Sequence, residues 1–267
     1  MRPRRIRKLD LGKTLFLLPN MITLSSVFCG FDAIRLAARA GEDDFYRAAI
    51  LLIFAMMFDT LDGRVARMTK TQSAFGVQID SLADVISFGV APALLVYRWA
   101  SPYHPMLALF TAFLFTSCGA IRLARFNVLT MGESGKPQKP GKYIVGLPIP
   151  GAAGILISLV VAEHAVGGPD AFEAWAWPVL ATTLGLSFLM VSTIKFRSFK
   201  DLKLNAGTLA LVAFVVGSSA LVYARLRPEF VLVWLLGFYI LIGLVETVWR
   251  FSRRKHPEPD DAPPPGA

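Results

Sequence analysis

The segment between residues 59 and 84 begins Asp59-Thr60-Leu61-Asp62-Gly63-Arg64-Val65-Ala66-Arg67 and continues, after eight further residues, with Gly76, Asp80 and Asp84. Residues three or four apart in an α-helix lie one turn apart on the same face. The first two aspartates therefore share one helical face, and the last two share another. Apolar segments flank both pairs, at residues 48–58 and 85–97. The four carboxylates are thus predicted to lie beside membrane-embedded helices.

Uncompensated charge is costly at this depth, and ionisable residues inside a membrane mark functional sites. Oxygen ligands select Mg²⁺, Mn²⁺ or Ca²⁺ over zinc, and the segment contains no His or Cys. Two such ions held about 4 Å apart form a clamp for phosphoryl transfer. The alternative interpretation is ordinary charges at helix ends. Ordinary helix-end charges would explain one pair of aspartates. They do not explain four aspartates that are interleaved with Gly63, Gly76 and Arg67.

The composition indicates a membrane protein. Of 267 residues, 54% are hydrophobic, and the mean hydropathy of +0.53 is far above that of a soluble domain. The net charge is +9, but the basic residues gather between apolar segments, which favours anionic membrane lipids as partners and argues against nucleic acid.

Cys29 and Cys118 lie in apolar runs and are expected to be free thiols. The histidines, His104, His164 and His256, have no ligand or triad partner at an informative spacing.

The apolar segments predict an all-α fold, a polytopic membrane helix bundle with about eight transmembrane helices. Pro19 predicts a break near Leu18 before the first membrane helix, because proline lacks a backbone donor. Residues 41–44 and 128–143 are expected to form loops. The helices are expected at about residues 15–38, 46–68, 76–98, 106–124, 146–162, 175–194, 207–223 and 229–251.

The basic loops predict the orientation of these helices. By the positive-inside rule both termini are cytoplasmic, with Arg225 and Arg227 as exceptions in an outside turn. Three regions follow: a basic cytoplasmic flank at 1–14, a membrane domain at 15–252 and a disordered, proline-rich tail at 253–267. Because the second helix ends and the third begins at the inner face, both aspartate pairs are expected near the cytoplasmic interface.

The aspartate segment resembles the signature of the CDP-alcohol phosphotransferases, Asp-x2-Asp-Gly-x2-Ala-Arg-x8-Gly-x3-Asp-x3-Asp, at every fixed position. The resemblance implies an enzyme that transfers a phosphatidyl-type group from a CDP-linked lipid to an alcohol and releases CMP. It also implies two divalent cations, Mg²⁺ or Mn²⁺, with Ca²⁺ as another occupant. Asp59, Asp62 and Asp80 would bind metal. Asp84 would bind metal and also act as the general base.

Four residues of the signature are expected to bind the donor, CDP-diacylglycerol. Arg67 can grip two phosphate oxygens with parallel hydrogen bonds, and Ala66 precedes it in the signature. Gly63 and Gly76 lack a Cβ atom, which lets a nucleotide approach the backbone. As isolated glycines, they would indicate only close packing of helices.

The first helix is expected to add two donor-binding residues, Asn20 and Thr23. Its Pro-Asn-x-x-Thr start is similar to the first helix of the family, where polar groups face the nucleotide. The alternative is that Asn20 only caps the helix. The diacyl tails can remain among the apolar helix faces while the CDP head lies at the inner interface.

Three further elements resemble the phosphatidylserine synthase branch of this family: residues 122–127, residues 146–150, and residues 190–192 followed by 196–200. That branch implies L-serine as acceptor, and an arginine can hold the carboxylate of serine as an ion pair. The alternative interpretation is that these basic residues only obey the positive-inside rule and that the asparagine caps a helix. The expected acceptor-binding residues are Arg122, Arg125, Asn127, Lys195 and Arg197.

Two other functions compete with this interpretation. A sibling enzyme using glycerol 3-phosphate would need a second phosphate pocket built from the same basic residues. A cation transporter would place its carboxylates near the bilayer midplane, beside interrupted helices. By analogy with the family, the protein is expected to be a homodimer in the cytoplasmic (inner) membrane, with its active site near the cytoplasmic face.

Overall fold

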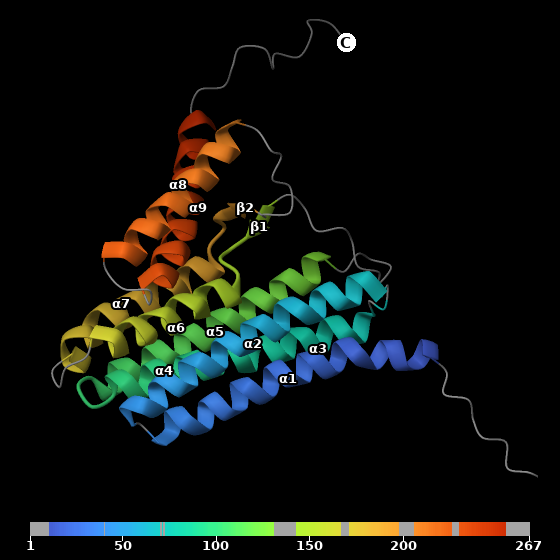
Figure 1. Cartoon of the computed structure of the whole chain (residues 1–267), viewed down its shortest axis with the longest axis horizontal. Coiled ribbons are helices and arrows are strands. Elements are labelled where there is room, and N and C mark those ends of the chain that lie inside the picture. Colours follow the sequence, from blue (N-terminus) through green and yellow to red (C-terminus); the bar gives the residue numbers. More distant parts are fainter. Residues whose placement is uncertain are drawn as a thin grey trace, which may run out of the picture.

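The computed structural model of the chain describes residues 11–39, 41–69, 71, 73–130, 143–166, 171–197, 206–225 and 230–254. Helices dominate this part of the chain, and one short pair of strands accompanies them (Figure 1). The elements are α1 (Leu11–Arg39), α2 (Glu42–Thr69), α3 (Ala74–Asp84), the π-helix η1 (Val85–Val90), α4 (Ala91–Ala100), α5 (Pro105–Thr130), β1 (Tyr143–Val145), α6 (Ile149–Val166), α7 (Ala171–Val191), β2 (Lys195–Arg197), α8 (Ala206–Arg225) and α9 (Phe230–Arg254).

The helices α1 to α7 form one bundle, from which the pair α8 and α9 projects (Figure 1). Helix α1 packs along α2, α5 packs against α4 and α7, and α6 contacts α2, α7 and α9. Large buried side chains such as Leu52, Phe88 and Phe115 fill the space between the helices. Small residues pack between them where α1 and α2 meet, including Ala33 and Ala48. These contacts hold α1, α2 and α3 together, and these three helices carry most of the predicted site.

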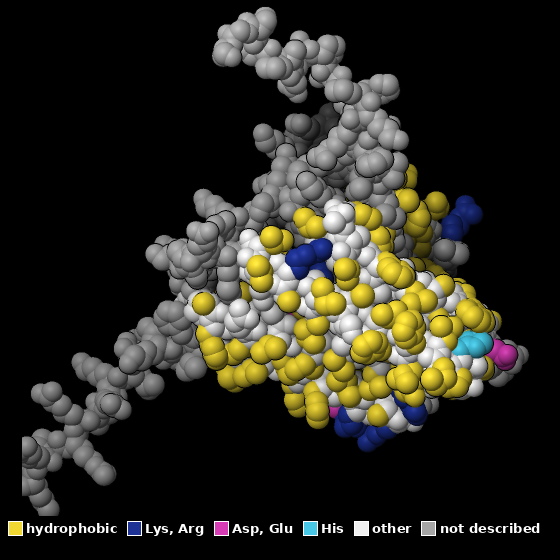
Figure 2. Space-filling view, turned by 180° about the vertical axis from the view of Figure 1, so that it is seen from behind, with side chains coloured by type: hydrophobic (Ala, Val, Ile, Leu, Met, Phe, Trp, Pro, Cys, Tyr) yellow, Lys and Arg dark blue, Asp and Glu magenta, His cyan; other side chains and the backbone are white. Residues whose placement is uncertain are grey.

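Apolar side chains cover the outside of the bundle as well as its inside. Phe28, Phe31, Phe110, Phe113 and Phe188 are each more than half exposed. Figure 2 shows such side chains over much of one face, with few charged groups among them. Within the described residues, five helices are long and apolar enough to cross a membrane. The expected helical membrane bundle is therefore confirmed.

Helix α2 is not among these five. Asp59, Asp62 and Arg64 interrupt its apolar run near its C-terminal end. The helix is nevertheless 28 residues long and packs along α1 in the bundle. Two of the three charges that interrupt the apolar run of α2, Asp59 and Asp62, therefore belong to the predicted site.

Several expected helix boundaries were wrong. Helix α1 is not broken near Leu18 but continues through Pro19. Proline is tolerated inside membrane helices. Helix α5 extends from the expected end at residue 124 to Thr130. Helix α2 begins at Glu42 rather than after an acidic loop, because negative charge stabilises the first turn of a helix.

The expected all-α fold holds for the described residues apart from two short segments, residues 143–145 and 195–197. These residues form an antiparallel pair of strands with Val145 opposite Lys195. The chain then turns at Gly146 at a φ of 80°, and a Cβ atom there would lie 2.3 Å from the Met190 carbonyl oxygen. Only glycine fits this turn, and it delays the start of α6 to Ile149. Alternation over three residues is too short a signal to predict from sequence.

The third expected helix contains a π-helical segment. α3, η1 and α4 follow one another without a break from Ala74 to Ala100, and η1 begins at the residue after Asp84. Short π-helical segments are rare and frequently lie at functional sites. The π-helical segment directly after Asp84 is therefore a second indication of a functional site at this residue, and the sequence pattern did not predict it.

Several expectations lie outside the described residues. They concern the first ten residues of the basic flank, the tail beyond residue 254, Arg227 and most of the loop at 128–143. The division of the chain into a flank, a membrane domain and a disordered tail remains a prediction.

Candidate active site

Three of the four signature aspartates come together at one point. Asp59 and Asp62 extend from α2 and Asp80 from α3, and one carboxylate oxygen of each lies within 4.8 Å of the others. Asp62 is only 4% exposed. Carboxylates this close repel one another, and burial removes the water that would screen them. The cluster therefore requires a compensating positive charge.

Asp84 lies one helical turn beyond Asp80 and beside Asp59. It is 9% exposed, and its Oδ1 atom has no hydrogen-bond partner among the residues that the structure describes. Buried carboxylate oxygens are nearly always paired. An unpaired one at the end of an aspartate cluster is suited to accept a proton or a metal ion.

This donor set fits a divalent metal ion. All the candidate ligand atoms are carboxylate oxygens, which Mg²⁺, Mn²⁺ and Ca²⁺ prefer. The cluster is partly enclosed, and the orphaned oxygen of Asp84 lies beside it. The geometry therefore supports a site for a divalent cation of this class at these aspartates.

Thr23 has a contact that sequence reasoning missed. Its hydroxyl donates a 2.6 Å hydrogen bond to Oδ2 of Asp62, and Thr23 itself is 5% exposed. This bond ties α1 to α2 and fixes the rotamer of the Asp62 carboxylate. Thr23 precedes Asp62 by 39 residues, so no local spacing could have indicated the pairing.

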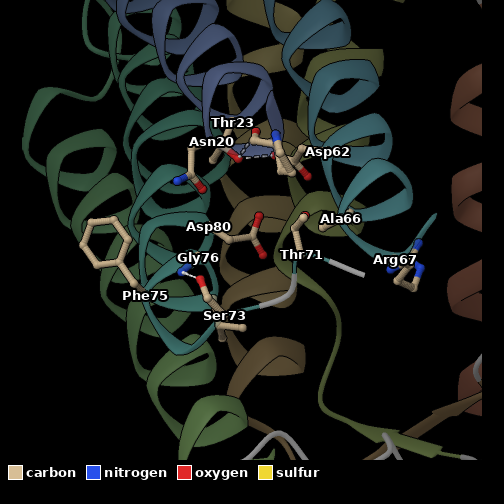
Figure 3. A pocket seen from close by; sticks show the side chains of 13 residues that line it. Asn20, Thr23, Asp62, Ala66, Arg67, Thr71, Ser73, Phe75, Gly76 and Asp80 are labelled. Carbon is tan, nitrogen blue, oxygen red and sulfur yellow. Dashed lines mark hydrogen bonds between the residues drawn. The ribbon is translucent and has the colours of Figure 1, made fainter. Parts of the chain in front are cut away.

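A cavity of about 420 Å³ opens next to the cluster, within the size range of small-molecule sites. In Figure 3, Asp80 lies below Thr23 and Asp62, with Asn20 on one side and Arg67 on the other. All six expected donor-binding residues line this cavity. The lining residues are Pro19, Asn20, Thr23, Asp62, Gly63, Ala66, Arg67, Thr71, Ser73, Phe75, Gly76, Val77 and Asp80.

The glycines of this cavity are not explained by helix packing. A Cβ atom at Gly63 would lie 3.5 Å from Nη1 of Arg67, in ordinary contact, and one at Gly76 would lie 3.2 Å from Oγ of Ser73. Neither would meet a neighbouring helix backbone within 4 Å. The alternative of close helix packing therefore loses its support. The absence of a side chain at both positions leaves more space in the cavity.

Five lining residues were not among the expected site residues: Pro19, Thr71, Ser73, Phe75 and Val77. Ser73 could have been found, because serine is a favoured N-cap and its hydroxyl accepts from the Gly76 amide at 3.0 Å. This cap begins α3 and so sets where Asp80 projects. Phe75 is 67% exposed and places an aromatic ring at the outer edge of the cavity (Figure 3).

Arg122 is buried and lies close enough to Asp84 to interact with its charge. Its guanidinium lies over the ring of Phe126 at 5.3 Å, and its Nε atom has no hydrogen-bond partner within the described residues. Tyr239 of α9 also lies near it. An arginine that only obeyed the positive-inside rule would extend to the surface, so this alternative does not describe Arg122.

Arg125, in contrast, donates hydrogen bonds to backbone carbonyls. Its Nη1 atom donates to the Val191 carbonyl at 3.0 Å, and its Nη2 atom donates to the carbonyls of Val145, Met190 and Ser192 at 3.3, 3.5 and 3.1 Å. The guanidinium thereby joins α5 to the end of α7 and to β1. This geometry favours a structural role over the expected contact with the acceptor.

Replacing Arg125 with lysine is expected to destabilise the protein without weakening acceptor binding. An ammonium cannot reach carbonyls in the planar fork of a guanidinium, and the loss of charged hydrogen bonds should cost about 2 kcal/mol of unfolding free energy. Thermal unfolding in detergent would measure this change, with Arg47→Lys at an exposed position as control. Normal stability combined with a tenfold higher KM for the acceptor would contradict the structural role.

The remaining acceptor candidates are less informative. Asn127 donates from Nδ2 to Oγ of Ser81 at 2.8 Å, which joins α5 to α3 rather than capping a helix. Lys195 and Arg197 lie in β2, and the structure describes only their backbone. Their proposed contacts with substrate remain predictions.

Known proteins resemble this chain over most of its length. The sequence model of the CDP-alcohol phosphatidyltransferase family matches residues 16–191. A CDP-diacylglycerol–serine O-phosphatidyltransferase of Helicobacter pylori is 37% identical over 240 residues, 89% of this chain and 92% of that protein. Proteins of the same name from Mycobacterium tuberculosis and Bacillus subtilis are 31% and 34% identical, over 84% and 68% of this chain and 76% and 91% of their own lengths.

Proposed function

The chain belongs to the CDP-alcohol phosphatidyltransferase family, and on this premise we propose that it transfers the phosphatidyl group of CDP-diacylglycerol to L-serine, forming phosphatidylserine and CMP. One observation carries the proposal. The cluster of Asp59, Asp62 and Asp80 opens onto the cavity that all six expected donor-binding residues line. The relatives that bear this enzymatic name support serine as the acceptor.

Four aspartates hold the metal ions in this proposal: Asp59, Asp62, Asp80 and Asp84. Two divalent cations, Mg²⁺ or Mn²⁺ with Ca²⁺ as another occupant, would neutralise the diphosphate and stabilise the leaving CMP. Thr23 keeps Asp62 in its binding rotamer through the 2.6 Å hydrogen bond. Asp59 lies between Asp62 and Asp84 and thereby joins the two helical pairs.

The donor occupies the cavity beside this cluster. Arg67 grips the diphosphate, because a guanidinium can donate two parallel hydrogen bonds to phosphate oxygens. Gly63 and Gly76 leave room for the nucleotide against α2 and α3, and Asn20 offers its amide from α1. The diacyl tails remain in the lipid, next to the exposed ring of Phe75.

Asp84 acts as the general base. The serine hydroxyl has a pKa far above neutrality and must lose its proton as it attacks. The hydroxyl oxygen bonds to the phosphorus that carries diacylglycerol, the bond from this phosphorus to the oxygen shared with CMP breaks, and the proton passes to Asp84. The unpaired Oδ1 atom of this buried side chain is suited to receive it.

The carboxylate of serine pairs with Arg122. This arginine is buried beside Asp84, so a serine held by its carboxylate would present its hydroxyl towards the proposed base. Asn127, Lys195 and Arg197 remain further candidates around the acceptor.

Replacing Arg122 with lysine is expected to raise the KM for serine at least about tenfold and to leave the KM for CDP-diacylglycerol within about twofold, because the lysine keeps the charge but loses the bidentate geometry. Initial rates of CMP release at varied serine would measure this, with Arg47→Lys as the exposed control. An unchanged KM for serine with a lower kcat would instead assign Arg122 to the orientation of Asp84.

The proposal includes the arrangement in the membrane. We place about eight helices across the bilayer, with both termini and the cavity on the cytoplasmic side of the inner membrane, because the positive-inside rule assigns basic loops to that side. The protein would act as a homodimer, as expected from its family. Accessibility of single cysteines introduced near each loop would test the orientation.

The test of the reaction is CMP release from CDP-diacylglycerol by the purified protein in detergent with Mg²⁺ or Mn²⁺. L-serine, glycerol 3-phosphate, inositol and no acceptor are compared. Release that depends on serine supports the proposal. Release only with glycerol 3-phosphate or inositol would retain the reaction and overturn the acceptor. Folded protein that releases no CMP with any acceptor would overturn the reaction and favour cation transport.

A further inference from the structure

Helix α1 contacts both helices that carry the aspartates, at a point away from the cavity. The hydroxyl of Ser26 donates to the carbonyl of Ala55 at 3.1 Å, and the hydroxyl of Ser87 donates to the carbonyl of Ser26 at 3.1 Å. Ala55 lies in α2 one turn before Asp59, and Ser87 lies in η1 one turn after Asp84. A short ladder of hydrogen bonds therefore links the two aspartate pairs through one residue of α1.

The ladder is buried and tightly packed. Ser26 is 2% exposed and Ser87 is fully buried, so neither hydroxyl exchanges its partner for water. One turn further along α1, a Cβ atom at Gly30 would lie 2.7 Å from Oγ and 2.9 Å from Cα of Ser87. These distances are too short for any residue but glycine, because backbone as well as side chain would have to move. Gly30 thus lets η1 approach α1.

We propose that Ser26, Ser87 and Gly30 are positioning residues that set the spacing of the two aspartate pairs and thereby the affinity for divalent cations. The inference rests on the proposed function in one respect, the metal site at the aspartates. None of the three residues lines the cavity, so they act only through the helices that they join.

The physical reason is the strict geometry of metal coordination. Mg²⁺ requires oxygens at about 2.0–2.1 Å in near-octahedral positions. The cluster draws its oxygens from two separate helices, so a shift of one helix against the other changes every distance between the pairs. Thr23 fixes only Asp62, on the α2 side. The ladder connects α2, α1 and the segment directly after Asp84 by hydrogen bonds.

The experiment measures Mn²⁺ binding to the substrate-free protein in detergent, from the electron paramagnetic resonance signal of free Mn²⁺. Ser26→Ala and Ser87→Ala are each expected to raise the dissociation constant about fivefold, since each loses one buried hydrogen bond. Gly30→Ala is expected to raise it more than tenfold, because the added methyl group pushes η1 away from α1. KM for serine and for CDP-diacylglycerol should change less than the Mn²⁺ requirement.

The chain offers matched controls. Ser158 is fully buried, but its hydroxyl donates at 2.8 Å to Ile155 in its own helix, so Ser158→Ala removes a buried bond without touching the ladder. Gly151 has no atom within 4 Å of an added Cβ, and Gly151→Ala controls for a glycine in a helix. In the double variant Gly30→Ala with Ser87→Gly, the contacts with Oγ and Cβ of Ser87 disappear, and part of the affinity should return.

The outcomes separate this inference from the proposed reaction. Mn²⁺ affinities of the ladder variants equal to those of Ser158→Ala and Gly151→Ala would overturn the positioning role. If Gly30→Ala does not fold, the two serine variants, which add no atom, decide the question. Weaker Mn²⁺ binding in the variants of a protein that releases no CMP would retain the positioning role and reject the reaction.

Discussion

Asp84→Asn is expected to reduce CMP release by at least about 10³-fold while the protein still folds. General bases contribute about 10²–10⁴-fold to rates. An asparagine amide does not accept the proton of serine and, because it is neutral, is a weaker metal ligand than a carboxylate. The side chain keeps its size, so the packing around this buried position is preserved. Initial rates with CDP-diacylglycerol and saturating serine, in Mg²⁺ and in Mn²⁺, measure the loss.

Stability separates a lost base from a misfolded protein in this variant. The asparagine removes a carboxylate that is buried beside Asp59, and this relieves repulsion between like charges. The melting temperature of the metal-free variant should therefore be at least that of the unchanged protein. Asp43→Asn, at an exposed carboxylate, is the matched control and should keep full activity. Activity of Asp84→Asn within tenfold of the unchanged protein would reject Asp84 as the base.

Asp62→Asn is expected to weaken Mn²⁺ binding at least about 100-fold and to abolish measurable transfer, since phosphoryl transfer at such sites depends on the bound cations. Asp62 is one of three residues whose oxygens lie within 4.8 Å of each other, and it is the most buried of them. Thr23 can still donate to the amide oxygen of an asparagine, so the local fold should persist. Mn²⁺ titration of the substrate-free protein and CMP release, measured on the same preparation, provide the two readouts.

The two carboxylate variants have different expected signatures. Asp62→Asn should lose Mn²⁺ binding and turnover together. Asp84→Asn should lose turnover by more than its change in Mn²⁺ affinity explains, because it removes the base as well as one ligand. Asp43→Asn again controls for the loss of one negative charge. Normal Mn²⁺ affinity in Asp62→Asn would place the cations elsewhere and remove the basis of the proposed mechanism.

The residues that line the cavity beside the aspartates were largely indicated by the sequence, because many of them are close together along the chain. Gly63, Ala66 and Arg67 follow Asp62 within about one turn of α2, so helical periodicity alone places them near the same face. Asn20 and Thr23 are three residues apart on α1 in the same way. All five line one cavity in the structure, although binding of the donor remains a prediction.

The acceptor side was predicted less well. Arg122 and Arg125 are three residues apart on one helix and looked equivalent in the sequence. In the structure, Arg122 is buried near Asp84, and Arg125 donates hydrogen bonds to four backbone carbonyls. Those carbonyls belong to residues 20 to 67 positions away, beyond the reach of any pattern of local spacing.

The amino-acid sequence by itself determined what depends on neighbours along the chain. These features are the apolar helices, the helical faces shared by each aspartate pair, and the residue types that suit a divalent metal. The tertiary structure alone decided the distance between the two pairs, the hydrogen bond from Thr23 to Asp62, the different roles of Arg122 and Arg125, and the serine ladder behind the site. The physical reason is that helix formation is governed by contacts three and four residues apart, whereas the packing of helices depends on close contacts between side chains far apart in sequence.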